Sequence, residues 1–120
     1  MRKRVTFLVV AIGLLVLAWS GYSKIVQARR EATYRAAVMP FHRDLRIGMD
    51  RAEVQTYLDS RRVDYHRVRY GGSDADTYEI KIAQEPDNLI CEHWTVYVAL
   101  EFNPAEKLRD IHLRKVGTCL

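Results

Sequence analysis

The chain begins with an unbroken apolar segment and continues with short segments in which apolar and polar positions alternate. Residues 5–23 contain no charged side chain, and Arg2, Lys3 and Arg4 come directly before them. At about 1.5 Å per residue this segment spans roughly 28 Å as a helix, close to the ~30 Å hydrocarbon thickness of a bilayer. The pattern predicts a transmembrane helix within residues 1–23.

Two interpretations of the apolar segment remain open. In the first it is a cleaved secretory signal, because Ala18-Trp19-Ser20 before Gly21 fits a small-x-small cleavage site. In the second it is an uncleaved anchor, because the segment is long and Trp19 and Tyr22 stand where interfacial aromatic residues are common. We favour the anchor. The positive-inside rule then keeps the N-terminus in the cytoplasm and predicts a single-pass inner-membrane protein with a periplasmic C-terminal domain.

The segment after the apolar run has the composition of a helix. Residues 24–38 are rich in good helix formers and contain neither glycine nor proline. They predict a juxtamembrane helical stalk that continues the membrane helix. Pro40 disfavours helical backbone at Met39 and predicts the end of this stalk. The expected organisation is a membrane helix over 1–23, a stalk over 24–40 and an extracytoplasmic domain over 41–120.

The stretch LRIGMDRAEV, residues 45–54, carries the signals of a helix start. Asp50 is a good N-cap residue, and Glu53 stands at the position that completes a capping box. Met49 and Val54 have the spacing of a hydrophobic staple. Apolar positions then follow at helical spacing in a helix over 50–60: Val54, Tyr57 and Leu58.

Alternation with a period of two predicts an antiparallel sheet after this helix. The first segment changes phase between Tyr65 and Val68, which predicts a bulge near Arg67. The predicted strands cover residues 62–70, 78–82, 94–102 and 108–116, and the turns between them cover 71–76, 84–88 and 103–107. Apolar side chains gather on one face of each strand, so the expected class is α+β, with one short helix packed on a three- or four-stranded sheet whose other face is wet.

The motif L-x-x-G-M-D-R-A-E-V-x-x-Y-L, residues 45–58, resembles the first-helix signature of the SmpA/OmlA lipoproteins, which include the BamE component of the outer-membrane β-barrel assembly machine. It is also similar to domains of the β-lactamase-inhibitor-protein-like fold. The resemblance implies a small envelope domain with a helical layer on an antiparallel sheet. The chain lacks a cysteine near the end of the apolar run, and Ser60-Arg61-Arg62 replaces the Gly-x-Pro common after the helix. The resemblance therefore implies the fold and not membership of the machine.

Cys91 and Cys119 stand at the two ends of the last predicted hairpin. A turn centred near residue 105 places them opposite each other, give or take one position, at a separation that a disulfide can bridge. Ile111 and Leu113 have the opposite parity to other apolar positions of the last strand, so the pleat must slip somewhere. In an oxidising compartment we expect a disulfide, and the alternatives are two unpaired thiols or a redox or catalytic thiol.

Charge and composition exclude several classes of function. Residues 1–40 hold seven Lys/Arg and one acidic residue, whereas the rest of the chain holds 12 Lys/Arg and 14 acidic residues. The folded part is thus close to neutral, which argues against nucleic acid as a partner. No catalytic set, cofactor motif, metal-ligand spacing or small-molecule site is evident, and we predict a protein that is not an enzyme. The four histidines are scattered, at positions 42, 66, 93 and 112.

The remaining candidate for function is a protein-binding surface on the wet sheet face. His93, Thr95 and Tyr97 are expected there, and Arg67 and Arg69 are expected to join them. The predicted function is that of a membrane-anchored, non-enzymatic envelope protein that contacts lipid through residues 5–23 and binds an envelope protein. The alternative is a secreted or tethered inhibitor of an extracytoplasmic enzyme, which predicts cleavage near Ser20.

Overall fold

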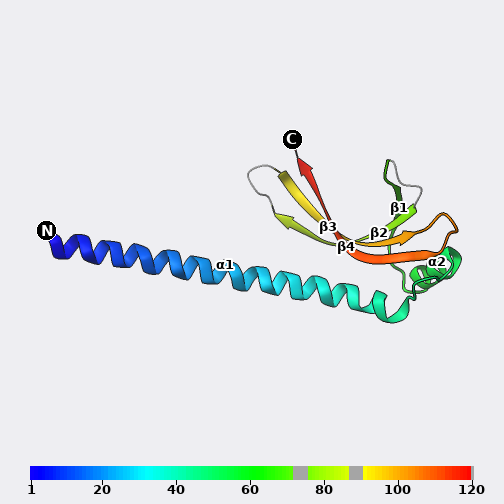
Figure 1. Ribbon diagram of the computed structural model, residues 1–120, viewed down its shortest axis with the longest axis horizontal. Helices are drawn as coiled ribbons and strands as arrows, with labels where there is room; N and C mark the ends of the chain where they lie inside the picture. Colours follow the sequence, from blue (N-terminus) through cyan, green and yellow to red (C-terminus); the bar gives the residue numbers. More distant parts are fainter. Residues whose placement is uncertain (72–75, 87–90, 120) are drawn as a thin grey trace. The chain divides into compact units, whose positions relative to one another are not determined.

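The computed structural model describes residues 1–71, 76–86 and 91–119, and it has the α+β class expected from the sequence (Figure 1). The predicted turns at 71–76 and 84–88 therefore lie partly outside the described residues. The elements are α1 (Arg2–Asp44), α2 (Arg51–Ser60), β1 (His66–Arg69), β2 (Asp76–Pro86), β3 (Cys91–Phe102) and β4 (Leu108–Cys119). The chain forms two compact units, residues 1–35 and 36–120.

The first unit consists of the N-terminal part of α1. Its mean hydropathy reaches 2.1 over an 18-residue window, so by length and composition the helix is able to cross a membrane. A signal sequence meets the same criteria. Large apolar side chains occupy all sides of the helix and are more than half exposed, as Leu8, Leu14, Leu15 and Leu17 illustrate. The prediction of an apolar helix of membrane-spanning length is confirmed.

The C-terminal end of α1 differs from the prediction. The helix continues through Pro40 to Asp44, so the expectation that it ends at the proline is wrong. A proline inside a helix costs about 3 kcal/mol. Val38, Phe41 and Leu45 around it are buried in the core, and each burial contributes roughly 1.5–3 kcal/mol. Burial of these side chains outweighs the local cost, and Ala36–Asp44 consequently belongs to the same compact unit as the sheet.

The four strands form one antiparallel sheet in the order β1-β2-β3-β4. Strand β1 begins only at His66 and pairs regularly with β2, so the bulge predicted near Arg67 is wrong. Val63 and Tyr65 precede the strand and pack against the core from an irregular segment, which explains the change of phase. Strand β2 extends to Pro86, into the region predicted as a loop.

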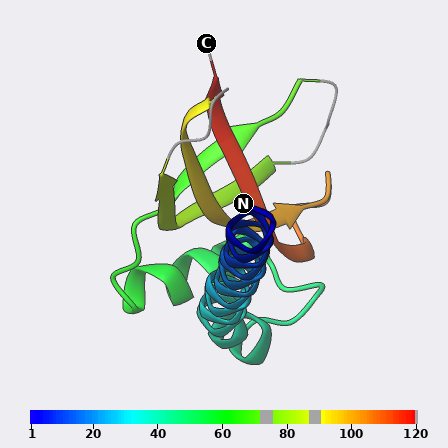
Figure 2. The same cartoon turned by 90° about the vertical axis from the view of Figure 1, so that its left-hand side faces the viewer.

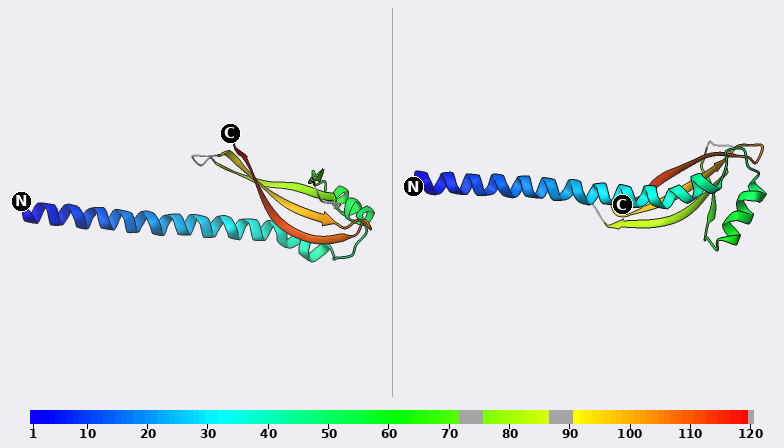
Figure 3. Two further views of the ribbon diagram at one scale, coloured as in Figure 1. Left: turned by 45° about the horizontal axis from the view of Figure 1, so that its top comes forward. Right: turned by 90° about the horizontal axis from the view of Figure 1, so that it is seen from below.

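A bulge between β3 and β4 explains the parity of the last strand. Phe102 pairs with Leu108 and Glu101 pairs with Asp110, so Arg109 is an extra residue. The bulge turns the backbone so that apolar residues on both sides of it point into the core, among them Ile111. The expected slip of the pleat therefore lies at Arg109. Beyond it β3 and β4 pair over a long, twisted ribbon (Figure 3).

The core of the second unit lies between α2, the end of α1 and one face of the sheet. Figure 2 shows α2 on one side of the strands. Val54 and Leu58 of α2 are fully buried, and the ring of Tyr78 lies 4.9 Å from that of Phe102, measured between centroids. The buried cluster comprises Val38, Phe41, Leu45, Val54, Leu58, Tyr78, Ile80, Val98, Leu100, Phe102, Leu108 and Ile111.

Helix α2 begins directly after Asp50, as predicted, but the capping differs. Asp50 has extended backbone angles and its side chain makes no capping hydrogen bond, so the capping box expected with Glu53 is not formed. The β3–β4 turn provides the contacts instead: the Arg51 N–H donates to the Glu106 carbonyl at 2.9 Å, and Lys107 Nζ donates to Asp50 Oδ1 at 2.7 Å. The helix start is therefore fixed by tertiary hydrogen bonds.

Candidate functional site

The sheet face opposite the core carries most of the polar side chains of the strands, and we refer to it as the polar face. Opposite residues of an antiparallel pair share a face. Tyr97 pairs with Lys81 on one side and with Arg114 on the other, which places all three on this face. The same alternation assigns the following residues to it: His66, Thr77, Glu79, Lys81, His93, Thr95, Tyr97, Glu101, Asp110, His112 and Arg114.

The structure brings together three of the five predicted surface residues and separates the other two. His93, Thr95 and Tyr97 follow one another along the polar face of β3. Arg67 pairs with Tyr78, whose ring lies in the core, so Arg67 projects from the opposite face. Arg69, two residues along, does the same. The two arginines therefore do not join the surface formed by β3.

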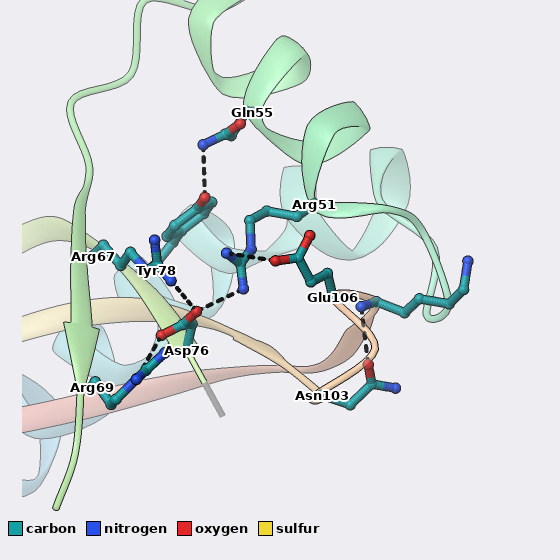
Figure 4. Close-up of polar contacts among 9 residues, drawn as sticks. Arg51, Gln55, Arg67, Arg69, Asp76, Tyr78, Asn103 and Glu106 are labelled. Atoms are coloured by element: carbon teal, nitrogen blue, oxygen red, sulfur yellow. Dashed lines mark hydrogen bonds and ion pairs between the residues drawn. The ribbon is translucent and has the colours of Figure 1, made fainter. Parts of the chain in front are cut away.

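Arg67 and Arg69 bind Asp76, a buried carboxylate at the start of β2 (Figure 4). Asp76 Oδ1 accepts from Arg69 Nε at 3.1 Å, and Oδ2 accepts from Arg67 and from Arg51 Nη2, the latter at 2.7 Å. Arg51 Nη1 also lies 3.4 Å from Glu106 Oε1. We name Asp76 and its three arginines the Asp76 cluster.

The Asp76 cluster has a structural role. Hydrogen bonds from Arg67 and then Arg69 hold the pKa of Asp76 well below its usual value of 3.8, so the carboxyl stays ionised. A carboxyl whose pKa is lower in the folded state than in the unfolded state stabilises the fold at pH values above its unfolded pKa. This contribution is lost as the pH falls through the folded pKa. The cluster joins α2 to the first hairpin and leaves Asp76 without a proton to donate at neutral pH.

A second buried carboxylate, Glu79, lies on the polar face, which the sequence predicted to be wet. Its side chain is only 4% exposed. The hydroxyl of Tyr70 donates to Glu79 Oε1, while His66 Nε2 lies 3.3 Å from Oε2 and Arg114 Nε lies 3.8 Å from Oε1. We name these four residues the Glu79 cluster. The Arg114 guanidinium lies 3.5 Å from the centroid of the Tyr70 ring, which it covers.

The Glu79 cluster holds its side chains in place on the polar face. Burial and, second to it, the hydrogen bond to Glu79 raise the pKa of Tyr70 to about 12. The His66 ring packs edge-on against Tyr97, with centroids 5.6 Å apart. The chain thereby holds aromatic, imidazole and guanidinium groups in one arrangement on neighbouring strands.

A shallow pocket of about 280 Å³ adjoins the Glu79 cluster. Its lining consists of Tyr70, Thr77, Glu101, His112 and Arg114. Three possible ligand atoms lie within 4.8 Å of one another here, one each from Glu101, Asp110 and His112. Such a donor set suits a divalent cation. In the structure Glu101 is paired with Arg109, and Asp110 Oδ2 lies 3.1 Å from His112 Nδ1.

The backbones of Cys91 and Cys119 are direct partners in the β3–β4 register. Antiparallel partners have Cα atoms about 4.5–5.5 Å apart, within the range that a disulfide spans. The side chains of both cysteines lie outside the described part of the chain, and the disulfide stays a prediction.

Comparisons with protein-family models, curated proteins and solved structures find no match to this chain. The fold and the site thus define a class only: an α+β domain preceded by an apolar helix of membrane-spanning length.

Proposed function

We propose that the protein is a membrane-tethered envelope protein whose domain binds another protein through its polar face. In this proposal residues 5–23 span the inner membrane and residues 24–35 form a helical stalk. The domain lies on the periplasmic side, because Arg2, Lys3 and Arg4 favour a cytoplasmic N-terminus. The proposal takes the envelope location, and no specific partner, from the resemblance to the SmpA/OmlA and inhibitor-like domains.

The observation that carries the binding proposal is the Glu79 cluster. Burying a carboxylate to 4% exposure is costly unless other groups pair with it. Here Glu79 is paired with His66 of β1, Arg114 of β4 and the hydroxyl of Tyr70. This arrangement fixes the side chains of His66 and Arg114 and, through His66, the position of Tyr97. Side chains that are already ordered lose less conformational entropy when a partner binds.

The chemistry of the polar face favours a protein partner. Tyrosine and arginine are enriched at the energetically important positions of protein interfaces. Tyr97 and Arg114 are direct partners in the register and are both partly exposed. The adjoining pocket adds hydroxyl, carboxylate and imidazole groups from Thr77, Glu101 and His112. Such a mixed and nearly neutral set suits a polar protein surface better than a polyanion.

Site-specific photo-crosslinking tests this proposal. A photoreactive amino acid at Thr95 of the polar face is expected to yield a discrete protein adduct in the membranes of the source cell. The same amino acid at Thr56, on the exposed side of α2, is the matched control and is expected to yield none. Failure of Thr95 to give an adduct, or identical adducts from both positions, would argue against binding through the polar face.

A further inference from the structure

Two carboxylates and one imidazole meet on the polar face, beside the shallow pocket. Glu101 of β3 and Asp110 of β4 are direct partners in the register, and His112 follows Asp110 by two residues. Partners across an antiparallel pair share a face of the sheet, as do residues two apart along one strand. The three side chains therefore project together, and one possible ligand atom of each lies within 4.8 Å of the other two.

The two carboxylates oppose each other directly, which is unfavourable for the sheet. Like charges at directly opposite positions of neighbouring strands are destabilising. Arg109, the extra residue of the bulge, pairs with Glu101. Asp110 Oδ2 instead lies 3.1 Å from His112 Nδ1. A divalent cation bound between the two strands neutralises both carboxylates at once, which neither of these contacts does.

The buried hydroxyl of Thr77 is an independent sign that a further group binds here. Thr77 of β2 pairs with Glu101 on the side of β3 that faces away from Asp110. It is only 5% exposed, and it lines the pocket together with Glu101 and His112. Within the described ranges its hydroxyl has no hydrogen-bond partner, although buried polar groups are nearly always hydrogen-bonded. The wall of the pocket therefore contains a polar group that a ligand, or water bound to that ligand, satisfies.

We propose that Glu101, Asp110 and His112 form a binding site for a divalent transition-metal ion, best suited to zinc, with the Thr77 hydroxyl beside it. Zinc takes imidazole nitrogen and carboxylate oxygen as ligands at about 2.0–2.2 Å. Two ligands of one tetrahedral zinc ion are then roughly 3.4 Å apart. The 3.1 Å between Asp110 Oδ2 and His112 Nδ1 is close to this separation. Magnesium and calcium prefer oxygen ligands, so the imidazole favours zinc over them.

Arg109 is the group that competes with the metal ion for Glu101. Its side chain is 55% exposed, and ion pairs at the surface contribute little to stability. A divalent ion is therefore able to displace the guanidinium from the carboxylate. Arg114, the other cation of the pocket, lies 3.8 Å from Glu79 and covers the Tyr70 ring instead. Loss of Arg109 consequently strengthens metal binding, whereas loss of any of the three ligands weakens it.

Isothermal titration calorimetry with zinc chloride, on the full-length chain in detergent, tests the site. Alkylation of the protein beforehand removes any free thiol of Cys91 and Cys119 as a competing ligand. The unsubstituted protein is expected to bind one zinc ion per chain. Magnesium chloride is expected to bind at least about tenfold more weakly, because the imidazole does not suit it.

Three substitutions separate the roles of the residues. His112→Gln is expected to weaken zinc binding at least about tenfold, since even the loss of a group that only orients a ligand costs about 10–100-fold. Arg109→Gln is expected to strengthen zinc binding roughly two- to fivefold, the equivalent of one surface ion pair. His42→Gln, which removes an exposed histidine of α1, is the matched control and is expected to leave the affinity unchanged.

Absence of zinc binding, equal affinities for zinc and magnesium, or equal zinc affinities of His112→Gln and His42→Gln would each overturn the site. Weaker binding by Arg109→Gln would overturn the competition for Glu101. Circular dichroism without metal shows whether each variant is folded. If His112→Gln unfolds, Asp110→Asn takes its place with the same expected loss. None of these outcomes depends on the membrane location or on a protein partner.

Discussion

Replacement of Phe102 by alanine is expected to lower the free energy of unfolding of the domain by about 3–5 kcal/mol. The Phe102 side chain is fully buried, its ring lies against that of Tyr78, and the guanidinium of Arg51 lies 5.5 Å from its centroid. Truncation leaves a cavity beside the partly buried Arg51, and the sheet is too rigid to close it. Since small domains have a total stability of only about 5–15 kcal/mol, the variant is expected to be partly unfolded at physiological temperature.

Chemical denaturation followed by circular dichroism measures this loss. Val116→Ala is the matched control on the neighbouring strand, because its side chain is 39% exposed, and we expect a change within about 0.5 kcal/mol, as is usual for surface substitutions. Equal losses for the two variants would mean that Phe102 is not the centre of the core.

Replacement of both Leu14 and Leu15 by arginine is expected to abolish stable insertion into the membrane. The two residues stand at the middle of the apolar run, where each arginine costs about 2.5–3.5 kcal/mol of insertion free energy. A pair of them adds roughly 5–7 kcal/mol, which is more than the remaining apolar side chains of the helix supply at a few tenths of a kcal/mol each. Alkaline extraction of membranes is expected to release the double variant into the supernatant.

Alanine at the same two positions is the control for this experiment. Leucine contributes only a few tenths of a kcal/mol per residue to insertion, so the double alanine variant is expected to stay in the membrane pellet. Retention of the arginine variant in the pellet would show that α1 is not held by the hydrocarbon core of a bilayer.

The sequence predicts those parts of the fold in which the side-chain pattern and the tertiary structure agree. The alternation along β3 is strong because three successive residues on one face of this strand, Val98, Leu100 and Phe102, lie in the core. The start of α2 is predicted correctly from Asp50. The end of α1 is not, because the local effect of Pro40 is outweighed by burial of side chains whose partners are distant in sequence.

The candidate site is predicted only in part. Alternation places His93, Thr95 and Tyr97 on one face, and the structure agrees. Asp76 and Glu79 are missed, since nothing in a local pattern distinguishes a buried carboxylate from a solvated one. A signal exists for Asp76: two arginines two residues apart face it across a short hairpin. Glu79 has its partners on two separate segments, β1 with the following Tyr70 and the distant β4, and only the sheet register brings them together.

The central claim is that α1 places the domain outside the inner membrane. Thiol labelling of spheroplasts with a membrane-impermeant maleimide tests it, using Thr56→Cys on the domain and Lys3→Cys at the N-terminus, each compared with the unsubstituted protein. We expect Thr56→Cys to be labelled in intact spheroplasts and Lys3→Cys to be labelled only after lysis. Labelling of Thr56→Cys only after lysis, or recovery of the protein from the soluble cytosolic fraction, would contradict the claim.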